Sequence, residues 1–256
     1  MQNKTKEAAA IICRSKLSLA LTGAGISVES GIPDFRSTDG LWARYDPMEY
    51  GTISAFRRNP QKVWDMVAEM SALMNNARPN TAHVGLARLQ QLGLLHTIIT
   101  QNVDNLHQAG GATRVIEFHG NSSSLICLWC GERYRSQSLS GKMPPKCDCG
   151  RILKPEVVFF GEPIPSAALA ESSRLAAACE ALLVVGTSAE VSPANTIPAM
   201  AKSAGAKIIE INLNPTVLTE SLTDLFLPGK ATEMVSQLVE AVEEAIPPSR
   251  DGHLHP

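Results

Sequence analysis

The feature that most constrains the fold is a series of short apolar segments alternating with longer segments in which apolar residues recur at helical spacing. The clearest apolar segments are LSLALTG at 17–23, LLHTIIT at 94–100, EALLVVGTS at 180–188 and AKIIEIN at 206–212. Strands that are apolar on both faces are buried on both faces, and strands that alternate with helices form parallel sheets. The sequence therefore predicts an α/β fold with helices on both faces of a parallel sheet.

Weaker strand signals and the helices complete this pattern. Further strands are expected at 115–120, 156–160 and 224–229. Helices are expected at 5–15, 59–76, 80–93, 166–179, 197–205 and 231–246. The second helix has one apolar face, which either packs on an apolar neighbour or lines a ligand tunnel. That face consists of Val63, Met66, Val67, Met70 and Met74.

Length and charge limit the class of protein. A chain of 256 residues with a formal net charge of −2 and a pI near 6.3 can form one large domain with a small insert. The near-neutral charge argues against direct binding to nucleic acid or to an anionic membrane. No apolar run approaches the roughly 20 residues of a membrane span, and the N-terminus lacks the apolar centre of a signal peptide. We expect a cytoplasmic protein, and its oligomeric state stays open.

The stretch TGAGISVESGIPDFRS at 22–37 follows the first apolar segment. A Gly-Ala-Gly turn between a strand and a helix presents N–H groups to a pyrophosphate, although many tight turns also carry Gly-x-Gly. The third glycine of a dinucleotide-binding motif is missing because position 28 is Val. No strand ending in an acidic residue follows about 20 positions later, as it does in dehydrogenases. A polar segment with Asp34 and Arg36 follows instead, which argues against hydride transfer and favours a loop over a bound nucleotide.

Polar side chains gather directly after the second apolar segment, in TQNVDNLH at 100–107. Open α/β sheets bind ligands at the carboxyl ends of their strands, and Asn and Asp can together pair with a carboxamide. Capping and turn roles would explain only one or two of Gln101, Asn102, Asp104 and His107. His119 ends another strand and is a candidate general base, although a lone histidine can equally be structural.

Four of the six cysteines lie close together, as the pairs Cys127 with Cys130 and Cys147 with Cys149. In a reducing compartment such clustering favours a metal, and four thiolates satisfy tetrahedral Zn²⁺ with no position left for water. The sequence thus predicts one structural zinc, with free thiols as the alternative. The second pair is one residue shorter than the usual Cys-x-x-Cys, so its turn differs from the usual knuckle.

A change of composition marks the domain organisation. The segment 121–155 has few apolar runs and is rich in cysteine, glycine (Gly141 among them) and proline. We expect a Rossmann-like domain from 1–120 and 156–246, and a zinc-binding module from 121–155 that a helical part around 40–75 joins. The polar tail 247–256 is expected to be flexible, with its two histidines, His253 and His255, in solvent.

Taken together, these motifs resemble the sirtuins, the NAD-dependent protein-lysine deacylases. GAGISVESGIPDFR, TQNVDNLH, FHG, the four cysteines, VVFFGE, GTS and IIEIN occur in the order of that family, over about residues 5–246. The resemblance implies a Rossmann-like NAD-binding domain, a zinc-binding insert, NAD as co-substrate and one structural Zn²⁺. It implies acyl-lysine-containing proteins or peptides as partners and leaves the particular protein substrates open.

The resemblance also implies roles for residues that match the family motifs. Phosphate or ribose contacts would come from Gly23, Ala24, Gly25, Asp34, Phe35, Arg36 and Gln101, and the carboxamide pocket from Asn102, Val103 and Asp104. The phosphates and adenosine would contact Gly186, Thr187, Ser188, Asn212, Asn214 and Ala231, beside Lys230. A substrate peptide would pair with Val158, Phe159, Phe160 and Gly161 by β-augmentation, although this segment can equally be a buried strand end.

The implied reaction transfers the acyl group of lysine to ADP-ribose. Nicotinamide leaves as the acyl oxygen attacks the ribose, and His119, Asn102 and Asp104 are the implied catalytic residues. Relatives that prefer succinyl-lysine carry Tyr and Arg three positions apart, where this chain has Val67 and Met70. Because a buried acyl carboxylate without a cation is costly, we expect acetyl or longer neutral acyl groups. The alternatives are ADP-ribosyl transfer or NAD hydrolysis, an NAD sensor without turnover, and a zinc-ribbon interaction protein.

Overall fold

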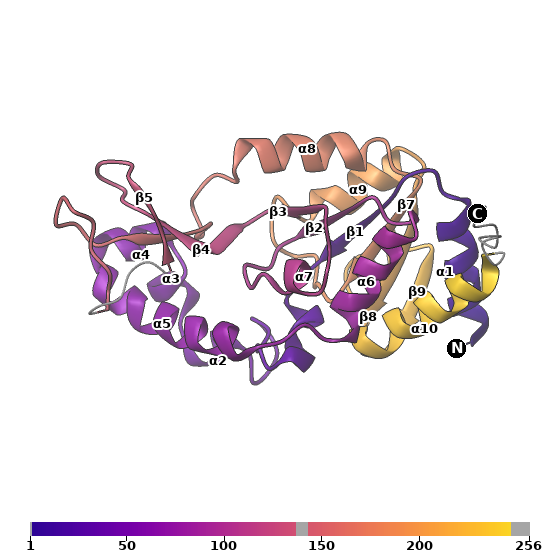
Figure 1. Ribbon diagram of the computed structural model, residues 1–256, viewed down its shortest axis with the longest axis horizontal. Coiled ribbons are helices and arrows are strands. Elements are labelled where there is room, and N and C mark those ends of the chain that lie inside the picture. The colour runs from indigo at the N-terminus through magenta and orange to yellow at the C-terminus, as the bar shows by residue number, and fades with distance from the viewer. Residues whose placement is uncertain (1, 137–142, 247–256) are drawn as a thin grey trace, which may run out of the picture.

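The computed structural model describes residues 2–136 and 143–246, so Gly141 and the tail 247–256 expected to be flexible lie outside the described residues. Its centre is a six-stranded sheet in the order β3-β2-β1-β7-β8-β9, in which every neighbouring pair is parallel (Figure 1). The strands are β1 (Ser18–Thr22), β2 (Thr97–Thr100), β3 (Val115–Glu117), β7 (Ala181–Val185), β8 (Lys207–Asn212) and β9 (Leu225–Pro228). The predicted parallel sheet is confirmed.

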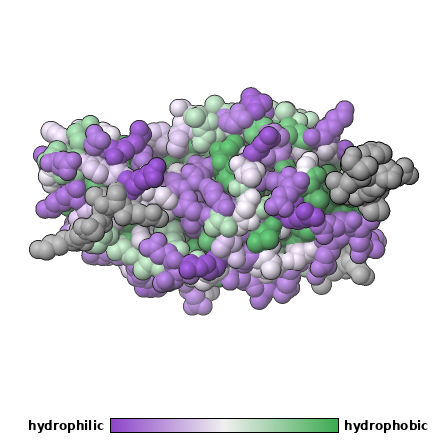
Figure 2. Space-filling view, in the orientation of Figure 1, coloured by the Kyte–Doolittle hydropathy of each residue, from purple (hydrophilic) through white to green (hydrophobic). Residues whose placement is uncertain are grey.

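Helices cover both faces of this sheet. One apolar cluster joins the sheet to α1 (Gln2–Arg14), α6 (Thr81–Gln91) and α10 (Ala231–Ala245) through fully buried side chains such as Ile12, Leu86 and Leu238. A second cluster joins the other face to α8 (Ser166–Ala176) and α9 (Thr196–Ser203). On the face seen in Figure 2, hydrophilic residues cover most of the rim and hydrophobic ones show mainly in the middle. No helix in the described part of the chain is long and apolar enough to span a membrane.

A smaller unit lies at the other end of the molecule (Figure 1). It consists of an antiparallel sheet in the order β5-β4-β6, formed by β5 (Arg133–Arg135), β4 (Gly120–Ile126) and β6 (Lys154–Val157). Three helices accompany it, α3 (Pro47–Tyr50), α4 (Ile53–Arg58) and α5 (Pro60–Asn76). Trp64 of α5 is buried in the shared apolar cluster, and its indole N–H donates to the carbonyl of Leu153 at 2.7 Å.

Local structure differs from the sequence-based prediction in two segments, 24–30 and 156–160. The helix expected after Gly25 is a pair of 3-10 turns, Ala24–Ile26 and Val28–Ser30, because Gly31 has a φ of +89° and Pro33 follows. The strand expected at 156–160 ends at Val157, and only Phe160 makes a further bridge, to Thr52. Two more short helices, α2 (Leu41–Arg44) and α7 (Leu106–Ala109), lie in the connecting segments.

Candidate functional site

A cleft of about 940 Å³ lies where the sheet's carboxyl edge meets the smaller unit. In the strand order, β2 and β3 lie on one side of β1, and β7, β8 and β9 lie on the other. Open α/β sheets bind ligands where the strand order reverses in this way. The cleft brings together most of the residues selected from the sequence. These are Gly23, Ala24, Gly25, Asp34, Phe35, Arg36, Gln101, Asn102, Val103, Asp104, His119, Val158, Phe159, Phe160, Gly161, Gly186, Thr187, Ser188, Asn212 and Asn214.

The glycine turn after β1 is held against the end of β7. The N–H of Gly23 donates to the carbonyl of Val185 at 3.1 Å, and the N–H of Gly25 donates to the carbonyl of Gly186 at 2.8 Å. A Cβ on Gly25 would lie 2.8 Å from both Cα and O of Gly186. The two backbones therefore approach more closely than any side chain allows, which leaves main-chain groups as the floor of the cleft.

The segment after the glycine turn is fixed by its own polar groups and by aromatic contacts. The Asp34 carboxylate accepts from the N–H groups of Arg36 and Ser37 at 2.9 and 2.7 Å. Arg36 forms an ion pair with Glu190 at 3.2 Å. The ring of Trp42 lies 5.3 Å from that of Phe35 and 6.2 Å from that of Phe160, between centroids. Trp42 thus joins the two sides of the cleft, and sequence reasoning missed it.

A hydrogen-bonded triplet of polar side chains forms the inner end of the cleft. The amide nitrogen of Asn102 donates to the carbonyl of Gly23 and to the hydroxyl of Ser27, both at 3.1 Å. The Ser27 hydroxyl donates to the Asp104 carboxylate at 2.7 Å. Ser27 is 1% exposed and links the turn after β1 to the segment after β2. Sequence reasoning missed Ser27, although its position two residues after Gly25 was the available signal.

His119 is held in one tautomer. Its Nδ1 lies 3.1 Å from the carbonyl of Gln101, so Nδ1–H donates to that oxygen and Nε2 carries the free lone pair. Burial lowers the pKa of His119 below its usual 6.5, while the bond to Gln101 opposes this shift. The imidazole is therefore neutral at pH 7 and can accept a proton in the cleft.

Two further histidines lie beneath the cleft rather than in it. His83 and His107 are fully buried, with ring centroids 5.0 Å apart. Burial lowers the pKa of His83 to about 4 and that of His107 to about 3. Nε2 of His107 lies 2.8 Å from the hydroxyl oxygen of Thr22, whose one O–H donates to the hydroxyl of Thr100 at 2.9 Å. His107, which follows the second apolar segment, is thus an interior residue.

The far side of the cleft is built from the ends of β7 and β8. The Gln101 amide donates to the hydroxyl of Thr187 at 3.0 Å, and the Asn212 amide donates to the carbonyl of Thr187 at 3.0 Å. Ala231 is not among the lining residues, because it is the buried first residue of α10. The preceding Lys230 pairs with Glu29 at 3.0 Å.

An apolar wall continues from the polar end of the cleft along α5. Met66, Val67, Met70 and Met74 line it, together with Ile32 and Leu106 of the opposite wall. Both expected roles of this helical face occur. Val63 is fully buried, and the other four side chains line the cleft, where Val67, Met70 and Met74 also pack on buried apolar residues. Among the described lining residues, Arg36 carries the one cationic side chain, and it is already paired with Glu190.

The segment after β6 presents main-chain groups to the cleft. The N–H of Val158 donates to the carbonyl of His119 at 2.8 Å, and both main-chain groups of Phe160 pair with Gly51 and Ile53 at 2.9 and 3.0 Å. Within the described residues, the carbonyl of Val158 and the N–H of Gly161 have no intramolecular partner. Both residues line the cleft, so an extended peptide can bond to them.

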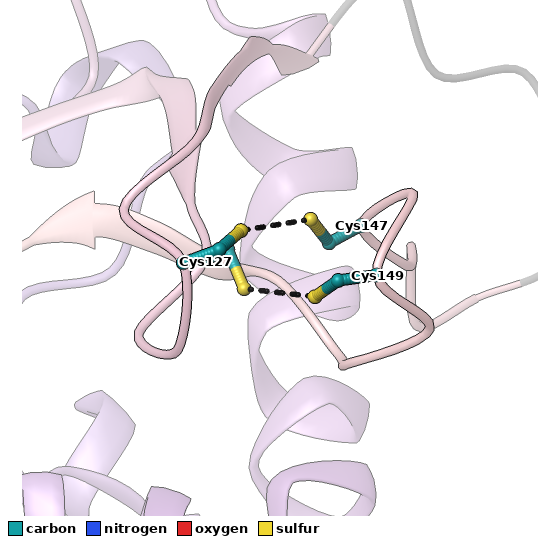
Figure 3. A group of neighbouring side chains, drawn as sticks. Cys127, Cys147 and Cys149 are labelled. Atoms are coloured by element: carbon teal, nitrogen blue, oxygen red, sulfur yellow. Dashed lines mark hydrogen bonds between the residues drawn. The ribbon is translucent and has the colours of Figure 1, made fainter.

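The four clustered cysteines converge on one point in the smaller unit, where Figure 3 shows Cys127, Cys147 and Cys149. The Sγ atoms of Cys127 and Cys149 are 3.6 Å apart, those of Cys130 and Cys147 are 3.4 Å apart, and all four lie within 4.8 Å of one another. These are the separations of ligands around a tetrahedral Zn²⁺ with bonds of about 2.3 Å. The donor set fits one structural zinc, and the shortened Cys-x-Cys pair reaches the same point as the ordinary pair.

Comparisons with known proteins give a consistent result. The family model described as the Sir2 family matches residues 23–193. The chain is 43% identical over 249 residues to the NAD-dependent protein deacylase 2 of Archaeoglobus fulgidus, covering 95% of this chain and 98% of the relative. It is similar to the structure of a Sir2 homologue in complex with NAD, with a TM-score of 0.88, 44% identity, and coverage of 93% and 94%. It is also similar to a Sir2 protein bound to a myristoylated histone peptide, with a TM-score of 0.81, 36% identity, and coverage of 96% and 98%.

Proposed function

The chain belongs to the Sir2 family, and we propose that its cleft removes acetyl or longer neutral acyl groups from protein lysine with NAD as co-substrate. The products are nicotinamide, O-acyl-ADP-ribose and free lysine. One observation carries this proposal. A glycine turn, an Asn–Ser–Asp triplet and a neutral histidine line the same cleft as an apolar wall and two free main-chain groups. Such a cleft can hold a dinucleotide, a carboxamide and an acyl chain together.

NAD would bind where the ends of β1 and β7 meet at the glycine turn. Gly23, Ala24 and Gly25 would lie against the phosphates, since all three residues line the cleft. Thr187, Ser188, Asn212 and Asn214 would contact the adenosine half, and Asp34, Phe35 and Arg36 would cover the nicotinamide ribose. Ala231 would affect the adenosine only indirectly, as the first residue of α10. Closure of the segment with Asp34, Phe35 and Arg36 over the ribose would exclude water that otherwise hydrolyses NAD.

The nicotinamide pocket would be formed by Asn102, Val103 and Asp104. NAD supplies a ribose carbon from which nicotinamide would depart, and the acyl oxygen of the substrate would form the new bond to that carbon. Ser27 holds Asn102 and Asp104 in place by the bonds at 3.1 and 2.7 Å. These side chains would fix the carboxamide in the orientation that favours departure, because a buried amide is bound only where its donors and acceptors are matched.

His119 would act as the general base of the second half of the reaction. Its Nε2 is unprotonated because Nδ1–H is engaged by Gln101. It would accept a proton from a ribose hydroxyl, so that this hydroxyl can attack the acyl carbon. General bases of this kind contribute roughly 10²–10⁴-fold to the rate. Replacing His119 by Ala should therefore remove deacylation while NAD binding remains.

The substrate side combines main-chain recognition with an apolar pocket for the acyl chain. The carbonyl of Val158 and the N–H of Gly161 would pair with the backbone of an extended peptide, with Phe159 and Phe160 beside it. Met66, Val67, Met70 and Met74 would contact the acyl chain, and no guanidinium of α5 lines the cleft in the described chain. A succinyl carboxylate would remain unpaired there, so neutral acyl groups are favoured.

Zinc is the structural partner of the smaller unit. Its cysteines leave no open ligand position, so the metal would stabilise the fold around α4, α5 and β4 rather than take part in the reaction. Four thiolates bind metal only while they are reduced. We therefore propose a cytoplasmic location, where thiols persist.

The experiment is a mass-spectrometric assay with NAD and peptides that carry acetyl-, butyryl-, myristoyl- or succinyl-lysine. Acylated ADP-ribose together with free lysine is the expected result for the three neutral groups and not for succinyl. His119→Ala should abolish both products, whereas His96→Ala, outside the cleft, should not. Nicotinamide release without deacylation would favour ADP-ribosyl transfer or NAD hydrolysis. NAD binding without turnover would favour a sensor. The absence of both NAD binding and turnover would favour the zinc-ribbon interaction protein.

A further inference from the structure

We propose that the ion pair between the buried Lys154 and Glu162, at the edge of the cleft, positions the main-chain groups that bind the substrate peptide. This inference rests on the proposed function and adds two positioning residues to it. Lys154 does not line the cleft, whereas Glu162 does, next to Gly161. Neither residue is among those proposed to contact NAD. The pair acts on the segment between its two members, which contains Val158 and Gly161.

Lys154 is the most enclosed charged side chain of the smaller unit that the structure describes, with 3% of its side chain exposed. Its Nζ lies 2.9 Å from the Glu162 carboxylate, 2.7 Å from the carbonyl of Val157 and 3.0 Å from that of Pro155. These contacts engage all three protons of the ammonium group. The group also lies 4.5 Å from the ring centroid of Phe159. Lys154 is therefore held in one position by four independent contacts.

Glu162 completes the arrangement from the other end of the segment. The carboxylate oxygen that receives Lys154 also accepts the N–H of Phe159 at 2.9 Å. In return, the N–H of Glu162 donates to the carbonyl of Phe159 at 3.0 Å. The segment is thus closed into a tight turn through Gly161, which has a φ of +86°. This turn ends the strand at Val157 and directs the following main chain toward the cleft.

Positioning is a better account of this pair than stability. Transferring two charges from water into the interior costs free energy that their attraction often does not exceed, and apolar residues of the same size are frequently as stable. The contacts of this pair go to main-chain groups at 155, 157 and 159 rather than to distant elements. The pair therefore determines the local backbone path, and the carbonyl of Val158 and the N–H of Gly161 depend on that path.

The test compares two substrates that differ only in main-chain contacts. One is an acetyl-lysine peptide of about ten residues, and the other is a single acetyl-lysine with both ends blocked, which cannot pair with a strand. We expect Glu162→Gln to raise KM for the peptide about 10-fold, which is ~1.4 kcal/mol. KM for NAD and the rate on the blocked monomer should stay near the wild-type values. Glu171→Gln, which breaks an exposed ion pair with Arg174, is the matched control and should change neither KM by more than about 2-fold.

A second variant separates positioning from folding. The double change Lys154→Met and Glu162→Met keeps the volume and removes both charges, so it should fold and still show the raised peptide KM. If this variant had the wild-type peptide KM, or if the blocked monomer were affected as strongly as the peptide, the inference would be overturned. Failure of the proposed function has a different signature, because the wild type itself would then leave both substrates unchanged.

Discussion

Replacing Gly186 by Ala should disrupt the close approach between the ends of β1 and β7. The φ of Gly186 is +61°, and a Cβ there would lie 2.5 Å from the nitrogen of Ile26 and 2.7 Å from the carbonyl carbon of Gly25. Both neighbours are main chain and cannot rotate away. The left-handed conformation costs an L-residue about 1–2 kcal/mol, and overpacking adds about 1–3 kcal/mol. We expect a loss of about 2–5 kcal/mol in the free energy of unfolding.

Two other glycines separate these contributions. Gly31 has a φ of +89° but nothing within 4 Å of an added Cβ, so Gly31→Ala should cost only the conformational part. Gly25→Ala adds the clash with Gly186 without a left-handed φ. Urea unfolding gives the three free energies, and calorimetric titration gives the Kd for NAD. Gly25→Ala and Gly186→Ala should weaken NAD binding at least about 10-fold, or ~1.4 kcal/mol, whereas Gly31→Ala should not.

The reasoning is refuted by either of two results. If Gly186→Ala costs no more stability than Gly31→Ala, then the backbone of the glycine turn moves freely and the close approach is not a constraint. If Gly25→Ala binds NAD as the wild type does, then the floor of the cleft does not receive the phosphates.

Three further predictions concern protonation and metal. Because burial lowers the pKa of His119 below 6.5, the acidic limb of kcat/KM against pH should have its midpoint below 6.5; a midpoint above that value would contradict the assigned base. His83 and His107 have folded-state pKa values of about 4 and 3, below the unfolded value, so the unfolded chain binds more protons and stability should fall as pH drops below 6.5. Each should cost about 1.4 kcal/mol per pH unit down to its own pKa, and urea unfolding at pH 7, 6 and 5 measures this slope. Removing zinc with a chelator, or replacing Cys147 by Ser, should unfold the smaller unit and abolish deacylation. If calorimetry still detects NAD binding, the larger unit folds without the smaller one. Unchanged deacylation would disprove a structural metal.

The sequence predicted most of the secondary structure because that information is local. The apolar face at every third or fourth position of residues 59–76 defines α5, and Asn59 caps it through the N–H of Lys62 at 3.1 Å. The parallel sheet followed from strands without a polar face, and the comparisons bear out the resemblance to the sirtuins. The zinc site followed from the spacing of four cysteines.

Errors arose where turn residues or side-chain contacts override the apolar pattern. The run 156–160 is apolar enough for a strand, but β6 ends at Val157, and the Glu162 carboxylate accepts the N–H of Phe159 at 2.9 Å. The helix expected after the glycine turn is only two 3-10 turns, because Gly31 and Pro33 end it. Ser27 was missed because its partner, Asp104, is 77 positions away in the sequence.

By itself, then, the sequence determined the element types, the parallel sheet, the metal ligands and the polar residues at the strand ends. Only the tertiary structure decided which of those polar groups share a hydrogen bond, which histidine is neutral beside the cleft and which lie beneath it. Propensity and periodicity depend on neighbours within about four positions. Burial, and with it the pKa of each histidine, depends on whatever the rest of the chain packs against that side chain.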